Sequence, residues 1–335
     1  MRRSGDEGFV LGIDLGGTKV AVSAADPAGR ILAHRRRPTA PTGSPERDLA
    51  ALADDARALV AEAGLDRGQL RAVGVSVPGP VDLEGGRVVD PPNLPGWGEV
   101  AVVAALEDAL GAPTWIDNDA NAAALAEWRF GAGRGRTHLV YMTMSTGIGG
   151  GLILGGRLHR GVACSAGEVG HIPVEWDGAP CACGQRGCLE AYIGGAAWTR
   201  HLRRVTPAES LAAQLAGGAE RVRPEELVEA ARRGDPFALR EMQRFVDYLA
   251  RGIVILSFVL APELFVLGTI AVAAGEELCF APLRERVRPR LWRVLRDRVE
   301  IRPAALGART AEFAGVCVAY EGLAGSLPRP AAARG

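Results

Sequence analysis

The sequence lacks the features that would bind it to a membrane or to a polyanion. Its 335 residues carry 39 basic and 39 acidic side chains, so the formal net charge is zero. Without a net electric field, the chain is not expected to recruit nucleic acid or an anionic membrane non-specifically. The longest apolar stretch, residues 253–267, is interrupted by Pro262 and Glu263 and falls short of the ~20 residues that cross a bilayer. This stretch predicts a buried helix end followed by a core strand, and the composition as a whole favours a small-molecule ligand.

Cysteine is also scarce. Six cysteines in a chain of this length are too few for a disulfide framework, and three of them crowd into residues 181–188. Residues 1–8 are charged and contain no apolar segment, which argues against a signal peptide and favours a cytoplasmic location with reduced thiols. Clustered thiols in that compartment indicate a metal site. The other three are interpreted as core thiols: Cys164, Cys279 and Cys317.

Hydrophobic periodicity predicts two α/β lobes in succession. The length alone exceeds the usual size of a single hydrophobic core. Strand, glycine turn and strand recur near residues 9–25 and 138–154, which suggests that one lobe plan is duplicated, and residues 192–260 predict an inserted helical subdomain. The expected strands are 9–13, 20–25, 31–37, 71–77, 114–116, 138–143, 152–154, 263–268 and 298–301, and the expected helices outside that subdomain are 48–63, 100–110, 120–128, 274–288 and 310–325.

The first glycine turn reads Asp14-Leu15-Gly16-Gly17-Thr18-Lys19 and lies between two expected strands. Glycines let the backbone approach a ligand, so that N–H groups can converge on an anion. A carboxylate beside such a cradle suits a magnesium ion or its waters. A plain Gly-Gly hairpin turn explains the motif equally well.

The second glycine turn, Ser145-Thr146-Gly147-Ile148-Gly149-Gly150-Gly151, adds two hydroxyls. Taken alone, such a run is more often a tight turn than a phosphate site. Two loops that open similar lobes could nevertheless hold a polyphosphate from both sides of a cleft, and phosphoryl transfer depends on such positioning. The pair therefore favours phosphate binding over either loop alone.

A cluster of Asx residues, Asp117-Asn118-Asp119-Ala120-Asn121, joins an expected strand to an expected helix. Its polar groups therefore lie at a helix N-terminus, where one of them suffices as a cap. The surplus indicates function. A carboxylate at this position could accept the proton of a hydroxyl as that hydroxyl attacks phosphorus.

The cysteine cluster, Cys181-Ala182-Cys183-Gly184-Gln185-Arg186-Gly187-Cys188, offers three thiolates for tetrahedral zinc. His171, shortly upstream, is the expected fourth ligand, although a lone histidine is usually a core residue and the thiols could also be unliganded. Four protein ligands would leave no open position, so a structural zinc is expected rather than a catalytic one.

Two carboxylates, Glu168 and Glu190, flank the cysteine cluster. Carboxylates that accept hydrogen bonds from neighbouring hydroxyls are typical of carbohydrate recognition. Their spacing alone would equally suit two solvated surface charges.

Together these motifs resemble the ROK family, which groups bacterial glucokinases and related hexose kinases with sugar-responsive repressors. The resemblance covers nearly the whole chain and looks most like the glucokinase branch. The motifs that carry it are residues 14–19, Pro78-Gly79-Pro80, residues 92–97 (Pro-Asn-Leu-Pro-Gly-Trp), Asn118-Asp119-Ala120-Asn121, residues 146–151, residues 168–171 and residues 181–190.

The resemblance implies an actin-like, ribonuclease-H-type fold, in which two α/β lobes bind nucleotide and sugar in the cleft between them. It implies ATP-dependent phosphorylation of a hexose at its 6-hydroxyl, with glucose as the leading substrate and Asp119 as the base. The implied sugar-binding residues are Gly79, Asn93, Asn118, Asp119, Glu168, His171 and Glu190. The implied nucleotide-binding residues are Asp14 for magnesium, and Gly16, Gly17, Thr18, Lys19, Thr146, Gly147 and Gly268 for ATP. Structural zinc would bind His171, Cys181, Cys183 and Cys188, with the second nitrogen of His171 left for a sugar hydroxyl.

The chain departs from the family pattern after the late core strand. Relatives usually carry a Gly-Gly-Gly-type adenosine loop there, whereas Gly268 is followed by Thr269 and Ile270. These side chains are expected to narrow the approach to the adenosine. A polyphosphate-using glucokinase therefore remains an alternative, although such relatives generally lack the cysteine loop. Kinases for N-acetylmannosamine or fructose differ only in pocket details.

A sugar-sensing regulator is a further alternative from the same family. Its repressors normally carry an N-terminal winged helix-turn-helix, whereas this chain reaches its first expected strand by Phe9.

The resemblance also suggests where the lobes begin and end. The first expected lobe is residues 1–117, joined by a C-terminal helix at about 308–325, and the second is residues 118–307, which include the zinc loop and the helical insertion. Residues 326–335 are expected to form a low-complexity tail. Relatives imply a homodimer or homotetramer.

Overall fold

The computed structural model describes residues 8–91 and 94–329, which fold into two compact units. The first unit contains the chain up to Ala126, the segment Arg160–Ser165 and the chain from Ala308. The second unit contains Glu127–His159 and Ala166–Gly307. The first unit extends beyond the boundary expected after residue 117, because Ala122 near the start of α3 (Asp119–Phe130) packs in its core. The lobe boundaries inferred from the sequence stay a prediction.

The first unit is built on a five-stranded sheet with the strand order β3-β2-β1-β4-β8. Its strands are β1 (Phe9–Leu15), β2 (Lys19–Ala25), β3 (Ile31–Pro38), β4 (Leu70–Val77) and β8 (Thr114–Asn118). The first three pair antiparallel, whereas β1, β4 and β8 run parallel. The register aligns Asp14 with Ser76 and Ser76 with Asp117, so three polar side chains come from neighbouring strands at the carboxyl edge of the sheet.

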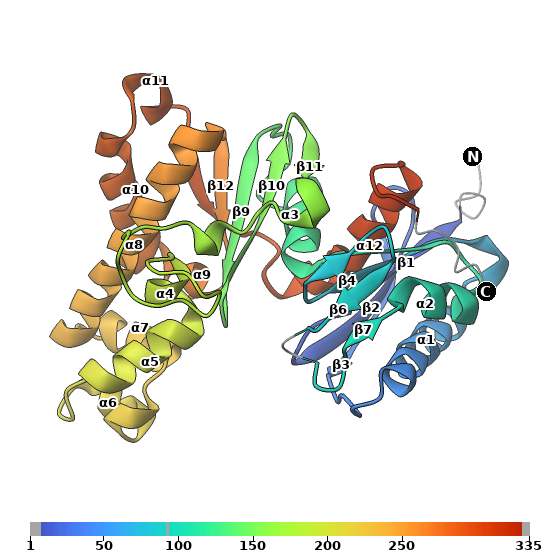
Figure 1. The fold of residues 1–335 in the computed structure, drawn as a ribbon, viewed down its shortest axis with the longest axis horizontal. Helices are drawn as coiled ribbons and strands as arrows, with labels where there is room; N and C mark the ends of the chain where they lie inside the picture. Colours follow the sequence, from blue (N-terminus) through green and yellow to red (C-terminus); the bar gives the residue numbers. More distant parts are fainter. Residues whose placement is uncertain (1–7, 92–93, 330–335) are drawn as a thin grey trace. The chain divides into compact units, whose positions relative to one another are not determined.

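Helix α12 (Thr310–Leu323) packs closely on this sheet, alongside β1 and β4 (Figure 1). The close approach depends on glycine: a Cβ at Gly74 would lie 2.1 Å from the carbonyl oxygen of Gly315, and a Cβ at Gly12 would lie 2.2 Å from the nitrogen of Val316. Helix α1 (Pro45–Glu62) begins with proline after the N-cap Ser44, and α2 (Val102–Leu110) ends at Gly111 with φ 69°. A small sheet completes the unit: β5 (Val81–Asp82), β6 (Arg87–Val89) and β7 (Glu99–Val100).

The second unit repeats the same plan. Its sheet has the order β11-β10-β9-β12-β13, which matches that of the first sheet strand for strand. The strands are β9 (Leu139–Met144), β10 (Ile148–Leu154), β11 (Arg157–His159), β12 (Leu264–Leu267) and β13 (Glu300–Pro303). The predicted duplication of one lobe plan is therefore confirmed.

Helices dominate residues 190–260 of the second unit, as predicted. They are α4 (Glu190–Ile193), α5 (Gly195–Val205), α6 (Leu211–Ala216), α7 (Pro224–Arg232) and α8 (Pro236–Leu260). Their shared core includes Trp198 and Phe245, which are fully buried and stack with ring centroids 4.7 Å apart. Among the described residues, no helix has both the length and the apolarity needed to cross a membrane.

The last part of this unit is more broken than the sequence suggests. The single helix expected over residues 274–288 is interrupted at Gly275, which has φ 82°. The segment instead forms α9 (Ile270–Gly275), a π-helical turn (Glu276–Phe280), α10 (Ala281–Val287) and, after a loop, α11 (Arg293–Arg296). Short 3-10 turns occur along the chain at Arg67–Gln69, Val162–Cys164, Val169–His171, Ala219–Arg221, Arg288–Arg290 and Gly307–Arg309.

Candidate active site and metal centre

Two carboxylates influence each other at the carboxyl edge of the first sheet. Asp14 lies near the end of β1, and Asp119 begins α3 directly after β8. The Ser76 hydroxyl donates a 2.6 Å hydrogen bond to Oδ1 of Asp14. Burial raises the pKa of Asp14 to about 6; the hydrogen bond from Ser76 opposes this rise, and the negative charge of Asp119 adds to it.

Three of the predicted sugar-binding residues, Gly79, Asn118 and Asp119, lie together at the start of α3. Oδ1 of Asp119 accepts a hydrogen bond from the backbone N–H of Ala120 at 2.8 Å, and Oδ1 of Asn118 accepts from the same N–H at 2.9 Å. Gly79 lies beside this turn, because a Cβ there would be 2.8 Å from Nδ2 of Asn118. Asn93, the remaining sugar-binding candidate in this part of the sequence, lies outside the described residues.

The first glycine turn is fixed by its neighbours and open to solvent. The N–H of Gly16 donates to the carbonyl of Lys19 at 2.9 Å, and the Thr39 hydroxyl donates to the carbonyl of Gly16 at 2.6 Å. Gly17, Thr18 and Lys19 are exposed. An anchored turn with exposed backbone suits the binding of a phosphate group.

Glu190 lies against the second glycine turn. Its Oε2 accepts a hydrogen bond from the N–H of Ile148 at 2.7 Å, and a Cβ at Gly147 would lie 2.4 Å from the same oxygen. A side chain at position 147 would therefore displace the Glu190 carboxylate. The first N–H groups of α5 also hold this turn, because Ala196 donates to the carbonyl of Thr146 at 2.8 Å. In the second unit, Glu190, which is predicted to bind sugar, therefore lies next to Thr146 and Gly147, which are predicted to bind phosphate.

A cavity of about 630 Å³ opens beside the same turn. Ser145, Thr146 and residues of α5 and α7 line it, together with Thr269 and Ile270. Its volume falls in the usual range for a small-molecule site. Sequence analysis missed three cations on its wall, Arg200, Arg203 and Arg223, which suit an anionic ligand. The basic run at residues 200–204 was the available signal for the first two.

Thr269 takes a backbone conformation that is typical of glycine, with φ 48° and ψ −108°. Its hydroxyl oxygen accepts a hydrogen bond from the N–H of Met144 at 2.8 Å and donates to the carbonyl of the same residue. Gly268, the predicted nucleotide residue before it, donates its N–H to the carbonyl of Met142 at 2.8 Å. Thr269 and Ile270 line the cavity without closing it.

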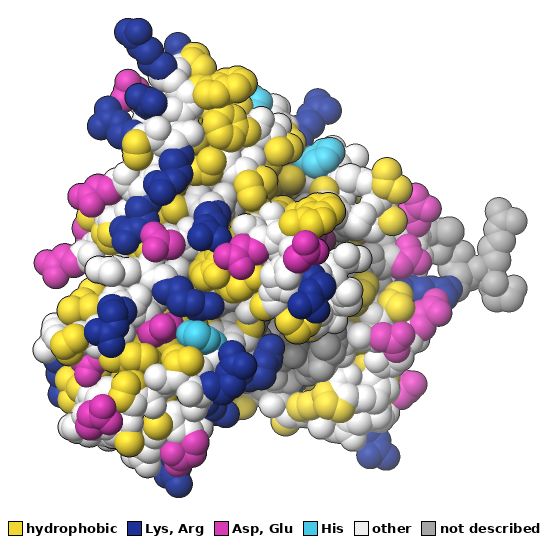
Figure 2. All heavy atoms as spheres, turned by 60° about the vertical axis from the view of Figure 1, so that its left-hand side comes forward, with side chains coloured by type: hydrophobic (Ala, Val, Ile, Leu, Met, Phe, Trp, Pro, Cys, Tyr) yellow, Lys and Arg dark blue, Asp and Glu magenta, His cyan; other side chains and the backbone are white. Residues whose placement is uncertain are grey.

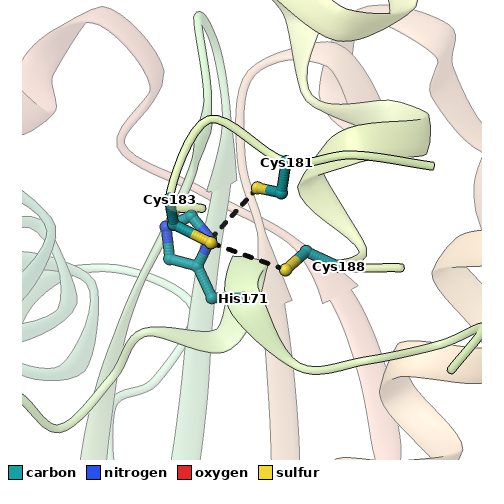
Figure 3. A group of neighbouring side chains, drawn as sticks. All are labelled: His171, Cys181, Cys183 and Cys188. Atoms are coloured by element: carbon teal, nitrogen blue, oxygen red, sulfur yellow. Dashed lines mark hydrogen bonds between the residues drawn. The ribbon is translucent and has the colours of Figure 1, made fainter. Parts of the chain in front are cut away.

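The four predicted zinc ligands converge (Figure 3). The ligand atoms of His171, Cys181, Cys183 and Cys188 all lie within 4.8 Å of one another. Sγ of Cys181 is 3.6 Å from Nδ1 of His171, and Sγ of Cys183 is 3.7 Å from Sγ of Cys188. Tetrahedral bonds of ~2.3 Å to sulfur and ~2.0 Å to nitrogen separate two sulfurs by roughly 3.8 Å and a sulfur and a nitrogen by roughly 3.5 Å. The arrangement therefore fits a tetrahedral Cys₃His zinc site.

The thiols of this cluster have unequal acidity. Burial raises the pKa of Cys188 to about 12, and hydrogen bonding to Cys183 and Cys181 adds to the rise. Burial also raises the pKa of Cys181, whereas a hydrogen bond from the backbone of Gln185 lowers that of Cys183. Three adjacent thiolates repel one another, and a bound dication would remove that repulsion.

His171 presents its second nitrogen to Glu168. Nε2 of His171 lies 3.8 Å from Oε2 of Glu168, while Nδ1 faces the thiols. The Glu168 side chain is 64% exposed and the His171 side chain 30% exposed. The imidazole therefore connects the metal cluster with a solvent-facing carboxylate.

Glu175, which the sequence analysis missed, fixes the cysteine loop to the helices. Its Oε1 accepts hydrogen bonds from the Tyr248 hydroxyl at 3.1 Å and from Arg251 at 2.7 Å, and its Oε2 accepts from the Tyr192 hydroxyl at 3.0 Å. The rings of Tyr192 and Tyr248 stack 4.1 Å apart. A single glutamate carries no spacing signal, so these partners are visible only in the fold.

Comparison with known proteins covers nearly the whole chain. The profile of the ROK family matches residues 10–317. A glucokinase of Thermotoga maritima is 39% identical over 280 residues, which are 83% of this chain and 86% of that protein. The crystal structure of a ROK hexokinase from Thermus thermophilus has a TM-score of 0.82 and 36% identity, and covers 95% of this chain and 99% of that chain. A ROK family glucokinase from Streptomyces griseus, in complex with glucose and AMPPNP, has a TM-score of 0.75 and 34% identity, over 94% of this chain and all of that chain (100%).

Proposed function

The chain belongs to the ROK family, and we propose that it is a glucokinase, which transfers the γ-phosphate of ATP to the 6-hydroxyl of glucose. The predicted actin-like fold is confirmed by the solved ROK kinases that it matches. Relatives named glucokinase, and one solved with glucose and AMPPNP, support the substrates. The observation within the chain that carries the proposal is the placement of Asp119 at the start of α3, directly after β8, at the same sheet edge as Asp14 and Ser76.

Asp119 is the proposed general base. A carboxylate at a helix N-terminus is a stabilised anion, and in this position it can take the proton of the 6-hydroxyl as that oxygen attacks the γ-phosphate in line. Asn118 and Gly79, which adjoin it, are proposed to position the sugar. The proposed sugar-binding set is completed by Asn93, Glu168, His171 and Glu190. The carboxylates of Glu168 and Glu190 would accept charge-assisted hydrogen bonds from sugar hydroxyls.

The glycine turns are proposed to hold the phosphates of ATP. Gly16, Gly17, Thr18 and Lys19 would act from the first unit, and Thr146, Gly147 and Gly268 from the second. The cavity beside Thr146 is the proposed adenosine site. Asp14 would hold magnesium or its waters, because a carboxylate oxygen is the ligand that this cation prefers. Bound magnesium supplies neutralisation of phosphate charge.

The metal cluster is proposed to bind structural zinc through His171, Cys181, Cys183 and Cys188. The interatomic distances support this assignment, since they fit tetrahedral bonds. The ion would fix the loop that carries His171 and thereby the direction of its second nitrogen. All four ligands come from the protein, so the proton transfer stays with Asp119.

Other hexoses and another phosphoryl donor remain as second candidates. N-acetylmannosamine and fructose kinases would share the residues proposed here. Inorganic polyphosphate as donor is favoured only by the change of sequence at Thr269, whereas the cavity that Thr269 lines favours ATP. A sugar-sensing regulator would not need Asp119. A cytoplasmic location and a homodimer or homotetramer stay predictions from the sequence.

A coupled assay that crosses a panel of hexoses with ATP and inorganic polyphosphate tests the proposal. We expect the highest kcat/KM with glucose and ATP, and no turnover with polyphosphate. A preference for N-acetylmannosamine or fructose would refute the choice of sugar, and turnover with polyphosphate alone would refute the donor. Failure to phosphorylate any hexose would refute the kinase assignment.

A further inference from the structure

A fully buried carboxylate precedes the proposed base by two residues. Asp117, at 0% exposure, belongs to β8 and carries a charge that is costly to bury unless it is paired and hydrogen-bonded. Its Oδ1 accepts hydrogen bonds from the N–H of Asn118 at 2.8 Å and from Nδ2 of Asn121 at 3.0 Å. These donors lie on either side of Asp119 in the sequence. Oδ1 of Asp117 therefore holds in place residues before and after Asp119, the proposed base.

Arg160 supplies the cation for this carboxylate. Its Nε donates to Oδ2 of Asp117 at 2.9 Å, and its Nη2 lies 2.8 Å from the same oxygen. The Arg160 side chain is 12% exposed. The same guanidinium reaches the C-terminal part of the unit, where Nη1 donates to the carbonyl of Ser326 at 3.2 Å and Nη2 lies 3.8 Å from Oε2 of Glu321. The Asp117 carboxylate thus has a partner on each oxygen.

The path of the chain gives this arginine an unusual position. Glu127–His159 belong to the second unit, Arg160–Ser165 belong to the first, and the chain returns to the second unit at Ala166, shortly before Glu168. Ala163 and Cys164 within this excursion have φ of 50° and 57°, which side-chain-bearing residues rarely adopt. Such conformations persist where surrounding contacts impose them. The ion pair of Arg160 is a buried contact at the first residue of the excursion.

We propose that Arg160 is a positioning residue for phosphoryl transfer, which acts through Asp117 to hold Asn118 and Asn121 and so to orient Asp119. The inference rests on the proposed role of Asp119 as the base. Without the guanidinium, Asp117 is a buried carboxylate that lacks a cation, and it must move toward solvent or take up a proton. Either response loosens the clamp around Asp119. A displacement of about 1 Å at a reacting group can lower the rate by roughly 100-fold.

Steady-state kinetics of Arg160→Met, which keeps an unbranched apolar stem and removes the guanidinium and its charge, test the proposal. We expect kcat to fall about 10- to 100-fold, with the KM values for glucose and ATP changed less than about threefold. Arg160→Lys should recover part of kcat, because an ammonium restores the charge without the planar geometry. Arg87→Met is the matched control, since Arg87 pairs with Glu99 in the same unit at 48% side-chain exposure, and it should keep wild-type kcat. Circular dichroism at the assay temperature gives the folded fraction of each variant.

A double variant separates positioning from general support of the fold. If Arg160 acts through Asp117, then Arg160→Met combined with Asp117→Asn should be no slower than the slower single variant. Wild-type kcat in folded Arg160→Met, a loss accounted for by the unfolded fraction, or losses that multiply in the double variant would each overturn the proposal. If Arg160→Met does not fold, Arg160→Lys decides: a lowered kcat at unchanged KM supports the proposal, and wild-type kcat overturns it. These outcomes differ from a failure of the proposed function, in which the wild-type protein itself would phosphorylate no hexose.

Discussion

At the scale of single residues, Asp14 combines a functional position with a cost in stability. Its pKa rises from 3.8 to about 6 on folding, mainly through burial. Because the folded state holds this proton more tightly, the contribution of Asp14 to stability is fully present below about pH 4 and is lost as the pH rises through about 6. At neutral pH the carboxylate therefore destabilises the metal-free protein.

We predict that Asp14→Asn is more stable than the wild type by about 1–3 kcal/mol at pH 7.5 and by progressively less toward pH 4. Urea unfolding with a chelator present, at several pH values, measures the difference. Asp54→Asn is the control, because the Asp54 side chain is 74% exposed on α1, and its effect should stay within about 0.5 kcal/mol at every pH. A destabilised Asp14→Asn at neutral pH would contradict this reading of the site.

The hydroxyl of Thr269 is expected to matter for nucleotide binding. It satisfies both backbone polar groups of Met144, the residue that precedes the second glycine turn. Thr269→Val keeps the branched shape but leaves these groups without a partner, so we predict that the KM for ATP rises about three- to tenfold while that for glucose is unchanged. Thr269→Ser keeps the hydroxyl and should behave like the wild type in the same assay. Equal effects of both variants would show that the hydroxyl is not responsible.

Single residues were predictable where they belong to a motif with a fixed spacing. The residues at 118–119 and the four metal ligands are close in sequence, so their chemistry is visible without a structure. Arg160 and Ser76 were not, since each meets its partner only through strand register or a chain excursion. The expected narrowing of the approach to the adenosine by Thr269 and Ile270 stays a prediction; in the fold, the Thr269 hydroxyl is engaged by Met144, and both residues line an open cavity.

At the scale of elements, the cysteine loop is held by two independent contacts: the candidate zinc ligands and the network around Glu175. Removal of the metal should therefore loosen the segment around His171 without detaching the whole loop. The expected consequence is weaker sugar binding with a smaller effect on kcat.

We predict that purified protein contains about one zinc per chain and that Cys183→Ser lowers both the zinc content and the affinity for glucose. Metal analysis and a glucose titration measure the two quantities. Cys279→Ala removes a buried thiol outside the cluster and should keep the zinc. Full glucose affinity in a zinc-free Cys183→Ser protein would separate the metal from the sugar site.

The elements themselves were largely predictable, because strands and helices follow hydrophobic periodicity. The strand-turn-strand repeat pointed to the duplication that the two strand orders confirm. The break at Gly275 was not predicted, since a lone glycine in a helical pattern is often tolerated, and here its positive φ ends the helix. The boundary between the two units is harder to predict from the sequence, because α3 begins in the first unit and ends in the second.

At the scale of the whole molecule, the 39 basic and 39 acidic side chains balance in total. Basic and acidic side chains are interspersed on the face drawn in Figure 2. Within the arginine-rich residues 284–302, Arg284, Arg286 and Arg288 each form an ion pair with an acidic side chain, which neutralises part of the positive charge of this segment.

Phosphoryl transfer by the whole molecule is proposed to depend on the carboxylate of Asp119, and the turnover of Asp119→Asn measures that dependence. With glucose and ATP saturating, we predict that kcat falls by about 10²- to 10⁴-fold, because proton transfer loses its acceptor. Glucose binding, measured by titration of the same protein, should be largely retained, because the amide keeps the shape of the side chain. A folded Asp119→Asn protein that binds glucose and turns over at the wild-type rate would contradict the proposed role of Asp119 as the base.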